Sequence, residues 1–468
     1  MSTSRRDFVK LVGSTAMFAP LAALYARTAD AAPSFGPGFG ALNPVLPTNT
    51  KDIILYNVDG SVAFDFSNKA LISLPPGFSY SVVSWTGQTM SDGTRVPSDH
   101  DGMAAFRGKD GTTVLVRNHE LSNRETKQGS NAGVVVPDDL KYDTWCNGGT
   151  TTLIMDDEGR LLSDFASVGG TNNNCAGGLT PWGTWLTCEE STSLATGTET
   201  GYQKRHGYVF EVPADATGPV LAEPIVAMGR FNHEATAADP ETGFVYQTED
   251  RGDSCIYRYI PNVPGKLIEG GRLQALKLSG PGYVNVDPIN GSVDTKSGFL
   301  DKLNVPLVCE WVDLDTVDSE LDNVRYLAHA KGATKFTRGE GLWYGDNNIY
   351  WVCSNGGNIG RGQVFAYNTV TETLTLIVES TDRSVIDAPD NITVGPDGRL
   401  YIYEDGSAGN NIVGVNSMGE IFRVAENKIN GSEFAGGCFS HNGRFMFVNM
   451  QSPGLTLVIE GPWRKGQR

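Results

Sequence analysis

The chain has 468 residues, of which 37 are Lys or Arg and 54 are Asp or Glu, so its formal net charge is −17. This acidity excludes a nucleic-acid binder that works through a basic face. A hydrophobic fraction of 40% supplies a large core and excludes a disordered chain, and the absence of long heptad runs excludes a coiled coil. The 56 glycines exceed the usual share of about 7%. We therefore expect an acidic, glycine-rich and β-rich globular protein.

The first residues predict an export signal. Ser4–Lys10 reads Ser-Arg-Arg-Asp-Phe-Val-Lys, as in twin-arginine signals, and the apolar run Leu11–Leu24 that follows is too short to span a bilayer. Ala29-Asp30-Ala31 has the small-x-small pattern of a cleavage site. We predict a signal peptide at residues 1–31, recognised by the twin-arginine translocon. Residues 32–468 would then form a soluble mature protein that is periplasmic or secreted.

The rest of the chain repeats a unit of two short strands joined by a glycine-containing turn. The units open at 99–103, 174–178, 232–234, 338–340, 387–391 and 433–436, and close at 118–120, 188–190, 249–250, 353–355, 404–405 and 449–451. Propeller blades of four strands need about 40–50 residues each. The pattern predicts a six-bladed β-propeller with inserted loops, in a single domain at 32–468. A β-sandwich with long loops is the alternative.

One interval between units is longer than the others. Asp250 and Ser354, which close the third and fourth units, lie 104 residues apart. This interval holds either a seventh blade or an insertion between Arg251 and Thr337.

The repeat places polar motifs at one rim of the central channel. Because the two strands of a unit are antiparallel, the start of the first lies beside the end of the second. Opening and closing motifs of all units should therefore gather around the axis, bringing about a dozen carboxylates together. Neighbouring carboxylates repel one another, so a cluster this dense needs multivalent cations, and oxygen ligands favour calcium. Cys175 would add a thiolate, which favours a softer or redox-active metal.

Each of these residues also has a plain structural interpretation. A single acidic residue at a strand end is usually solvated, His233 alone can be a hydrogen-bonded structural histidine, and Cys175 alone can be a small buried apolar side chain. The seven cysteines form no Cys-x-x-Cys pair, and their odd number leaves at least one free thiol or metal ligand. His-Glu-x-x-His, a P-loop and Gly-x-Ser-x-Gly are all absent.

Taken together, the motifs resemble the PhoX-type alkaline phosphatase family over about residues 50–460. The matching segments are Asp101-Gly102-Met103-Ala104-Ala105-Phe106, Arg117-Asn118-His119-Glu120, Asn174-Cys175-Ala176-Gly177-Gly178, Thr187-Cys188-Glu189-Glu190, Asn232-His233-Glu234, Thr248-Glu249-Asp250, Arg338-Gly339-Glu340-Gly341 and Asp387-Ala388-Pro389-Asp390-Asn391. The chain is shorter than the longer members of that family. This difference bears on both its turnover and its ion set.

The resemblance implies a monomeric propeller phosphatase that hydrolyses phosphate monoesters at a cluster of calcium and ferric ions with a bridging oxo group. Cys175 matches the iron-ligating cysteine and Arg338 the arginine that holds the phosphate. Asn147 would add a hydrogen bond to the phosphate. The metal-ligand carboxylates implied by the resemblance are Glu190 or its neighbour Glu189, Glu249 and Glu340, with Glu120, Glu234 and Asp390 as further ligands.

Two other functions fit the same residues. A calcium-dependent propeller lactonase or esterase needs carboxylates around calcium, but neither a cysteine ligand nor a phosphate clamp. A calcium-stabilised propeller without activity would use the cluster only for its structure. Hydrolysis of lactones without phosphatase activity would indicate the first, and inert ester substrates the second.

Overall fold

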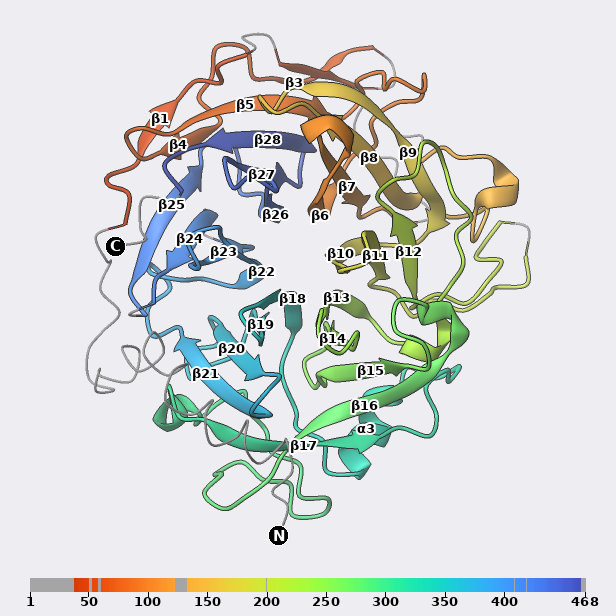
Figure 1. Ribbon diagram of the computed structural model, residues 1–468, viewed down its shortest axis with the longest axis vertical. Coiled ribbons are helices and arrows are strands. Elements are labelled where there is room, and N and C mark those ends of the chain that lie inside the picture. Colours follow the sequence, from red (N-terminus) through yellow and green to blue (C-terminus); the bar gives the residue numbers. More distant parts are fainter. Residues whose placement is uncertain are drawn as a thin grey trace.

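The computed structural model describes residues 38–49, 53–57, 60–122, 133–198, 200–407, 409–417 and 419–463. The predicted export signal lies outside these ranges. Regular structure in the described residues is almost entirely β, arranged as groups of strands around a central axis (Figure 1). No helix among them is long and apolar enough to cross a membrane.

Each group begins with an inner strand and continues outward through antiparallel neighbours. In chain order the described groups are β6 (His100–Arg107), β7 (Thr113–His119), β8 (Gly148–Met155) and β9 (Leu161–Thr171); β10 (Asn174–Leu179), β11 (Thr184–Glu189) and β12 (Val209–Pro213); β13 (His233–Ala238), β14 (Val245–Glu249), β15 (Tyr257–Pro261) and β16 (Gly271–Leu278); β18 (Gly339–Gly345), β19 (Asn348–Cys353), β20 (Gln363–Asn368) and β21 (Thr373–Glu379); β22 (Pro389–Val394), β23 (Leu400–Glu404), β24 (Asn411–Val415) and β25 (Ile421–Asn427); and β26 (Phe434–Phe439), β27 (Phe445–Met450), β28 (Leu455–Glu460) and β5 (Ser79–Trp85).

The inner strands close a ring around the axis. β6 contacts β10, β10 contacts β13, β13 contacts β18, β18 contacts β22, β22 contacts β26, and β26 contacts β6 again (Figure 1). A sandwich of two facing sheets would not produce this closed sequence of neighbours. The predicted β-propeller is therefore confirmed, and the sandwich alternative is wrong.

The last group is completed by a strand from the other end of the chain. β5 lies outermost beside β28, with Leu455 opposite Trp85 and Glu460 opposite Ser79. The ladder of hydrogen bonds between these distant segments fastens the ring where its two ends meet.

The long interval between the third and fourth units contains an insertion rather than another blade. Its strand β17 (Leu307–Asp313) pairs with β16 on one side and with β21 on the other, which joins two neighbouring groups. The insertion also carries α3 (Val324–Ala330). At the periphery, β1 (Asn43–Val45) and β4 (Ile72–Leu74) extend the group of β25, while β2 (Ile54–Tyr56) and β3 (Val62–Asp65) form a hairpin. Short 3-10 helices are η2 (Lys109–Gly111), η3 (Asp138–Leu140), η4 (Val226–Met228), η5 (Leu267–Glu269) and η6 (Leu300–Lys302).

Hydrophobic side chains fill the space between neighbouring groups. For example, Val352 and Val364 of the fourth group share a buried cluster with Ile392, Ile402 and Val413 of the fifth. Full burial of one such side chain contributes roughly 1.5–3 kcal/mol. This packing on both faces holds the inner strands in fixed positions, and the functional residues project from their ends.

Candidate metal centre

Every inner strand is irregular near its start, directly after its first pair in five groups and after its second pair in the sixth. The register shifts follow His100, Asn174, His233, Gly339, Pro389 and Ala435. A bulge adds a residue to one strand and re-aims the side chain there. In five of the six groups, the residue after that first pair is a carboxylic acid or a cysteine: Asp101, Cys175, Glu234, Glu340 and Asp390. In the sixth group, the residue after the second pair is Gly436.

In four of the six groups, the residue after the second strand adds a further acid to the same end of the channel. Glu120, Glu190, Asp250 and Asp405 directly follow β7, β11, β14 and β23. Their electrostatic coupling joins different groups, since Glu190 is influenced by Glu120 and Asp250. We call the following set the axial cluster: Asp101, Glu120, Cys175, Glu190, Glu234, Asp250, Glu340, Asp390, Asp405 and Glu433.

Two sets of three side chains in the axial cluster are close enough to hold metal ions. One consists of Cys175, Glu190 and Glu234, and the other of Glu234, Glu340 and Asp390. In each set, one potential ligand atom per residue lies within 4.8 Å of the others. Because Glu234 belongs to both sets, its carboxylate can bridge two neighbouring ions. All five residues were predicted as ligands from the sequence.

Four acids of the axial cluster hold protons more strongly than usual in the absence of cations. Burial, reinforced by neighbouring carboxylates, raises the pKa of Glu234 and Glu340 well above the usual range. The same two causes raise the pKa of Glu190 to about 9 and that of Asp390 to about 7. Near neutral pH such a site must share protons or bind cations.

Side-chain amides position the carboxylates at the edge of the cluster. Asn173 Nδ2 donates to Glu120 Oε1 at 2.9 Å and to Glu190 Oε2 at 3.3 Å. Gln451 Nε2 donates to Glu120 Oε2 at 2.7 Å and to Asp101 Oδ2 at 3.2 Å. Asn173 adopts a left-handed backbone conformation with φ 55°, which directs the chain into β10. These contacts leave Glu120 in the cluster but outside the two sets of three.

Cys175 is the axial cluster's only sulfur donor. All seven cysteines are free and buried. Burial, together with the charges of Glu234 and Glu190, raises the pKa of the Cys175 thiol well above the usual range. Its Sγ lies 3.3 Å from the His233 carbonyl oxygen, to which the thiol donates. A thiolate at this position therefore requires a bound metal.

Arg338 is a cation at the edge of this acidic group. Its Nε lies 3.0 Å from Asp250 Oδ1 and its Nη2 lies 2.9 Å from Glu340 Oε1. The side chain is 44% exposed, so part of the guanidinium can reach a ligand from solvent. Arg338 has φ 47°, a conformation that costs a non-glycine residue roughly 1–2 kcal/mol. Such strain is typical of functional sites, and it directs this side chain over the rim.

Two of the predicted ligands are placed elsewhere. Glu189 Oε1 accepts a hydrogen bond from His206 Nδ1 at 2.7 Å, and Oε2 accepts one from the Gly207 N–H at 2.8 Å. Glu249 Oε1 lies 3.3 Å from Arg325 Nη1 and belongs to an ion-pair network outside the cluster. Both residues are the last of their strands, and successive strand side chains point in opposite directions. Their neighbours Glu190 and Asp250 face the axis instead, so these placements differ from the expectation.

Asn147 lies just before β8 and is half-buried. Its carbonyl oxygen accepts a hydrogen bond from Val134 N at 2.9 Å. No hydrogen bond joins its side chain to another described residue, which leaves its predicted contact with phosphate as an expectation.

Asp101, Asp250 and Asp405 lie within the predicted opening and closing motifs but were not named as ligands, and neither was Glu433, whose pKa is raised by burial and by the charges of Asp390 and Asp101. The useful signal was their position. Asp101 follows the first pair of its strand, Asp250 and Asp405 follow the last residue of theirs, and Glu433 directly precedes β26.

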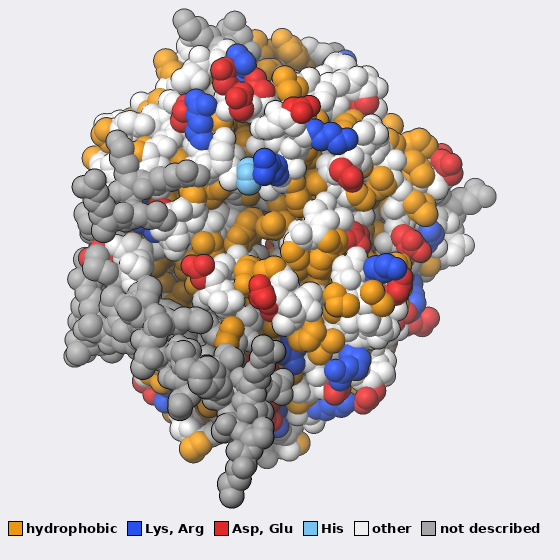
Figure 2. Space-filling model, in the orientation of Figure 1, with side chains coloured by type: hydrophobic (Ala, Val, Ile, Leu, Met, Phe, Trp, Pro, Cys, Tyr) orange, Lys and Arg blue, Asp and Glu red, His pale blue; other side chains and the backbone are white. Residues whose placement is uncertain are grey.

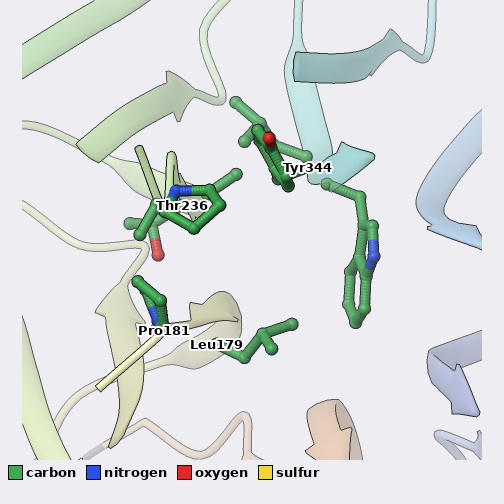
Figure 3. Close-up of a pocket in the computed structure, with 9 residues that line it drawn as sticks. Leu179, Pro181, Thr236 and Tyr344 are labelled. Carbon is green, nitrogen blue, oxygen red and sulfur yellow. The ribbon is translucent and has the colours of Figure 1, made fainter. Parts of the chain in front are cut away.

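The opposite end of the inner strands is apolar. A cavity of about 190 Å³ is lined there by Leu179, Pro181, Thr236, Ala237, Ala238, Pro240, Leu342, Trp343 and Tyr344 (Figure 3). Figure 2 shows hydrophobic side chains gathered around the central hollow of the face drawn in Figure 1. This cavity lacks the carboxylates that distinguish the other rim.

Comparison with known proteins identifies the family. The family model described as "Alkaline phosphatase PhoX" matches residues 61–163 and 158–454, which is most of the chain. The chain belongs to the PhoX alkaline phosphatase family. This confirms the family and the enzyme class predicted from the motifs. The match includes every member of the axial cluster.

A PhoX structure shares the fold. Pseudomonas fluorescens PhoX in complex with vanadate, a transition state analogue, aligns with a TM-score of 0.64 and 19% sequence identity, covering 89% of this chain and 98% of the other. At this identity the likeness concerns the fold alone.

Another solved structure aligns less well. A gluconolactonase from Xanthomonas campestris has a TM-score of 0.40 and 13% identity, covering 90% of this chain and 98% of its own. No curated protein matches the chain significantly.

Proposed function

We propose that this PhoX family member is an exported phosphatase that hydrolyses phosphate monoesters at a calcium and ferric-iron centre in the axial cluster. The observation that carries the proposal is the pair of three-residue sets joined through Glu234, with a thiol in one set and an exposed guanidinium beside the other.

The two sets differ in the ions that they suit. Glu234, Glu340 and Asp390 offer only carboxylate oxygens, which hard cations such as Ca²⁺ prefer. Cys175, Glu190 and Glu234 combine a sulfur with two carboxylates, and a thiolate favours a transition metal such as iron. The donor chemistry therefore fits both predicted ions. It also favours the phosphatase over a lactonase that would need calcium alone.

The charge of the substrate makes cations necessary. A phosphate monoester is a dianion near neutral pH and would be repelled by the bare carboxylates. When bound, the metal ions would reverse the local potential and supply Lewis-acid polarisation of the phosphoryl group.

The chain's own contribution is to position the ions and the substrate. Arg338 presents its partly exposed guanidinium to the phosphoryl oxygens. Its ion pairs with Asp250 and Glu340 fix the orientation of the guanidinium. Asn173 and Gln451 hold the Glu120 carboxylate in place through their amide groups. We propose no amino-acid nucleophile, and we assign Asn147 a second hydrogen bond to the phosphate.

The proposal also covers the export of the protein and its oligomeric state. The Arg5-Arg6 motif and the cleavage pattern before residue 32 support export through the twin-arginine translocon to the periplasm or the medium. We propose that the mature protein acts as a monomer.

Hydrolysis of p-nitrophenyl phosphate by the metal-loaded protein tests the function. Removal of one preorganised hydrogen-bond donor to the developing charge typically costs about 10²–10³-fold in rate, so we expect a loss of at least that order in kcat/KM for Arg338→Ala. Arg160→Ala, which changes an exposed arginine paired with Asp156, should match the wild type. Unchanged kcat/KM in Arg338→Ala would show that Arg338 does not hold the phosphoryl group. Lactone hydrolysis without phosphatase activity would indicate the lactonase, and inert esters the structural scaffold.

A further inference from the structure

A further group of side chains that could hold a metal ion lies outside the axial cluster. Asp143 and Cys146 come from the segment before β8, and His206 from the segment before β12. His206 Nε2 lies 3.5 Å from Cys146 Sγ and 3.3 Å from Asp143 Oδ2. The three side chains are almost completely buried, with 4% of Cys146 and 1% or less of the other two exposed.

We propose that Asp143, Cys146 and His206 bind one divalent transition-metal ion of borderline softness, such as Zn²⁺, at a site separate from the phosphatase centre. The role of this ion would be structural. It would fasten the segment before β8 to the segment before β12.

The distances fit such an ion. Bonds of about 2.0–2.1 Å to nitrogen, 2.3 Å to sulfur and 2.0–2.2 Å to oxygen in a tetrahedral site separate neighbouring ligand atoms by roughly 3.3–3.6 Å. The two separations from His206 Nε2 agree with those edges. All three ligand atoms also lie within 4.8 Å of one another, so they can share one ion.

The surroundings of His206 support the same conclusion. Metal-binding histidines commonly donate their other ring N–H to a carboxylate, which fixes the tautomer and raises the basicity of the ligand nitrogen. Here Glu189 Oε1 lies 2.7 Å from His206 Nδ1 and takes that role. Backbone N–H groups of Trp145, Gln203 and Lys204 donate to the Asp143 carboxylate and fix its orientation.

A network of hydrogen bonds and ion pairs around His206, without a metal ion, explains fewer of these contacts. A protonated His206 between Asp143 and Glu189 would satisfy both carboxylates, and their charges raise the pKa of His206 to about 12 despite its burial. That network needs no sulfur, yet Cys146 Sγ faces the same ring nitrogen as Asp143 Oδ2. A metal ion explains why the thiol and the carboxylate converge on Nε2.

Binding of one divalent ion in exchange for two protons leaves the net charge of this site unchanged. Without metal, the carboxylates of Asp143 and Glu189, the imidazolium and the neutral thiol together carry one negative charge. Binding of M²⁺ releases the proton from His206 Nε2 and the proton from Cys146 Sγ, so two protons leave and the net charge stays the same. The proton on Nδ1 remains in its hydrogen bond to Glu189.

The site would also position two residues of the phosphatase centre. Asn147 directly follows Cys146, and Glu190 directly follows Glu189. An ion at the second site would therefore restrain the backbone next to Asn147 directly, and the backbone next to Glu190 through the hydrogen bond between His206 and Glu189.

Metal content of the full mature protein tests the proposal. We would reconstitute chelator-treated protein with Co²⁺ and measure bound cobalt and the visible absorption of its thiolate complex. Cys146→Ser should lose one equivalent of cobalt relative to the wild type, while Cys438→Ser, which changes a buried cysteine of the sixth group, should lose none. Cys175→Ser should keep the absorption that Cys146→Ser loses. Equal cobalt content in Cys146→Ser and Cys438→Ser would overturn the proposal.

A second measurement uses the wild type and does not depend on how the variants fold. Crystals of the Zn²⁺-loaded protein should give an anomalous scattering peak at the zinc edge between Cys146 Sγ and His206 Nε2. A map with no peak there would contradict the site, whatever ions occupy the axial cluster.

Discussion

Glu189 and Glu190 are neighbours in the chain, but their carboxylates serve opposite sides of β11. Glu189 accepts hydrogen bonds from His206 and the backbone of Gly207, whereas Glu190 joins Cys175 and Glu234 in a set that can hold a metal ion. The alternation of side chains along a strand separates one structural acid from one functional acid.

This separation predicts opposite effects of two similar substitutions. Glu190→Gln should lower bound iron and phosphatase activity while the free energy of unfolding of the metal-free protein stays near that of the wild type. Glu189→Gln should keep the axial metals but destabilise the fold by about 2–4 kcal/mol, because it removes a buried charge that accepts several hydrogen bonds. Metal analysis and urea unfolding of both variants measure the two effects. Loss of iron in Glu189→Gln with no change in stability would reverse the assignment.

The sequence predicted the propeller because its repeated turns and motifs are local signals. Asp110-Gly111 is one such turn between the first two strands of a unit, and both residues adopt positive φ as a tight turn requires. The strand order that closes the ring could not be predicted in the same way. The pairing of β5 with β28 joins segments near opposite ends of the chain, and no local sequence pattern predicts it.

The site could be predicted to within one residue at the strand ends. Cys175, Glu234, Glu340 and Asp390 follow the first pair of an inner strand, and each was named from its motif. Glu249 was named in place of Asp250, because both acids are adjacent in the closing motif and the sequence does not show which faces the axis. The bulges that set this direction arise from pairing between strands.

Without its metal ions, the protein should become less stable as pH rises. In the metal-free state the folded pKa values are raised, to about 9 for Glu190 and about 7 for Asp390, above those of the unfolded chain. The folded state then binds more protons, so its stability is greatest below the unfolded pKa values and declines as pH rises through this range. Urea unfolding of chelated and metal-loaded protein at about pH 5 and about pH 9 measures the difference. The prediction fails if the chelated protein is equally stable at both.

The sixth inner strand contributes space rather than a ligand. Gly436 has φ 60°, and a Cβ there would overlap the Asp101 carbonyl oxygen. Gly436→Ala should therefore destabilise the fold by at least about 2 kcal/mol and disturb the cluster. Gly398→Ala is the matched control, since Gly398 also has positive φ but an added Cβ meets nothing within 4 Å. Thermal unfolding should show the larger loss for Gly436→Ala, and equal losses would contradict this reading.

The inserted helix α3 should make the protein sensitive to acid. Burial, with a smaller effect of Lys335, lowers the pKa of His329 to about 4, although Asp253 opposes the shift and Arg325 adds to it. The folded pKa is depressed, so the unfolded chain binds the proton first and stability falls as pH drops from about 6.5 to about 4. His329→Gln should reduce the slope of this part of the stability profile, as measured by urea unfolding, while His100, His119 and His233, whose pKa values burial also lowers, keep the rest of it. A profile as steep as that of the wild type would count against His329.

The central claim is that the axial cluster holds iron through Cys175 and calcium through its carboxylates. The most direct test is elemental mass spectrometry of the mature protein, purified without chelator, for the wild type, Cys175→Ser and the control Cys438→Ser. We predict both calcium and iron in the wild type and in Cys438→Ser, and calcium with little or no iron in Cys175→Ser. Iron content that is the same in Cys175→Ser as in the wild type, or a wild type with calcium alone, would contradict the account.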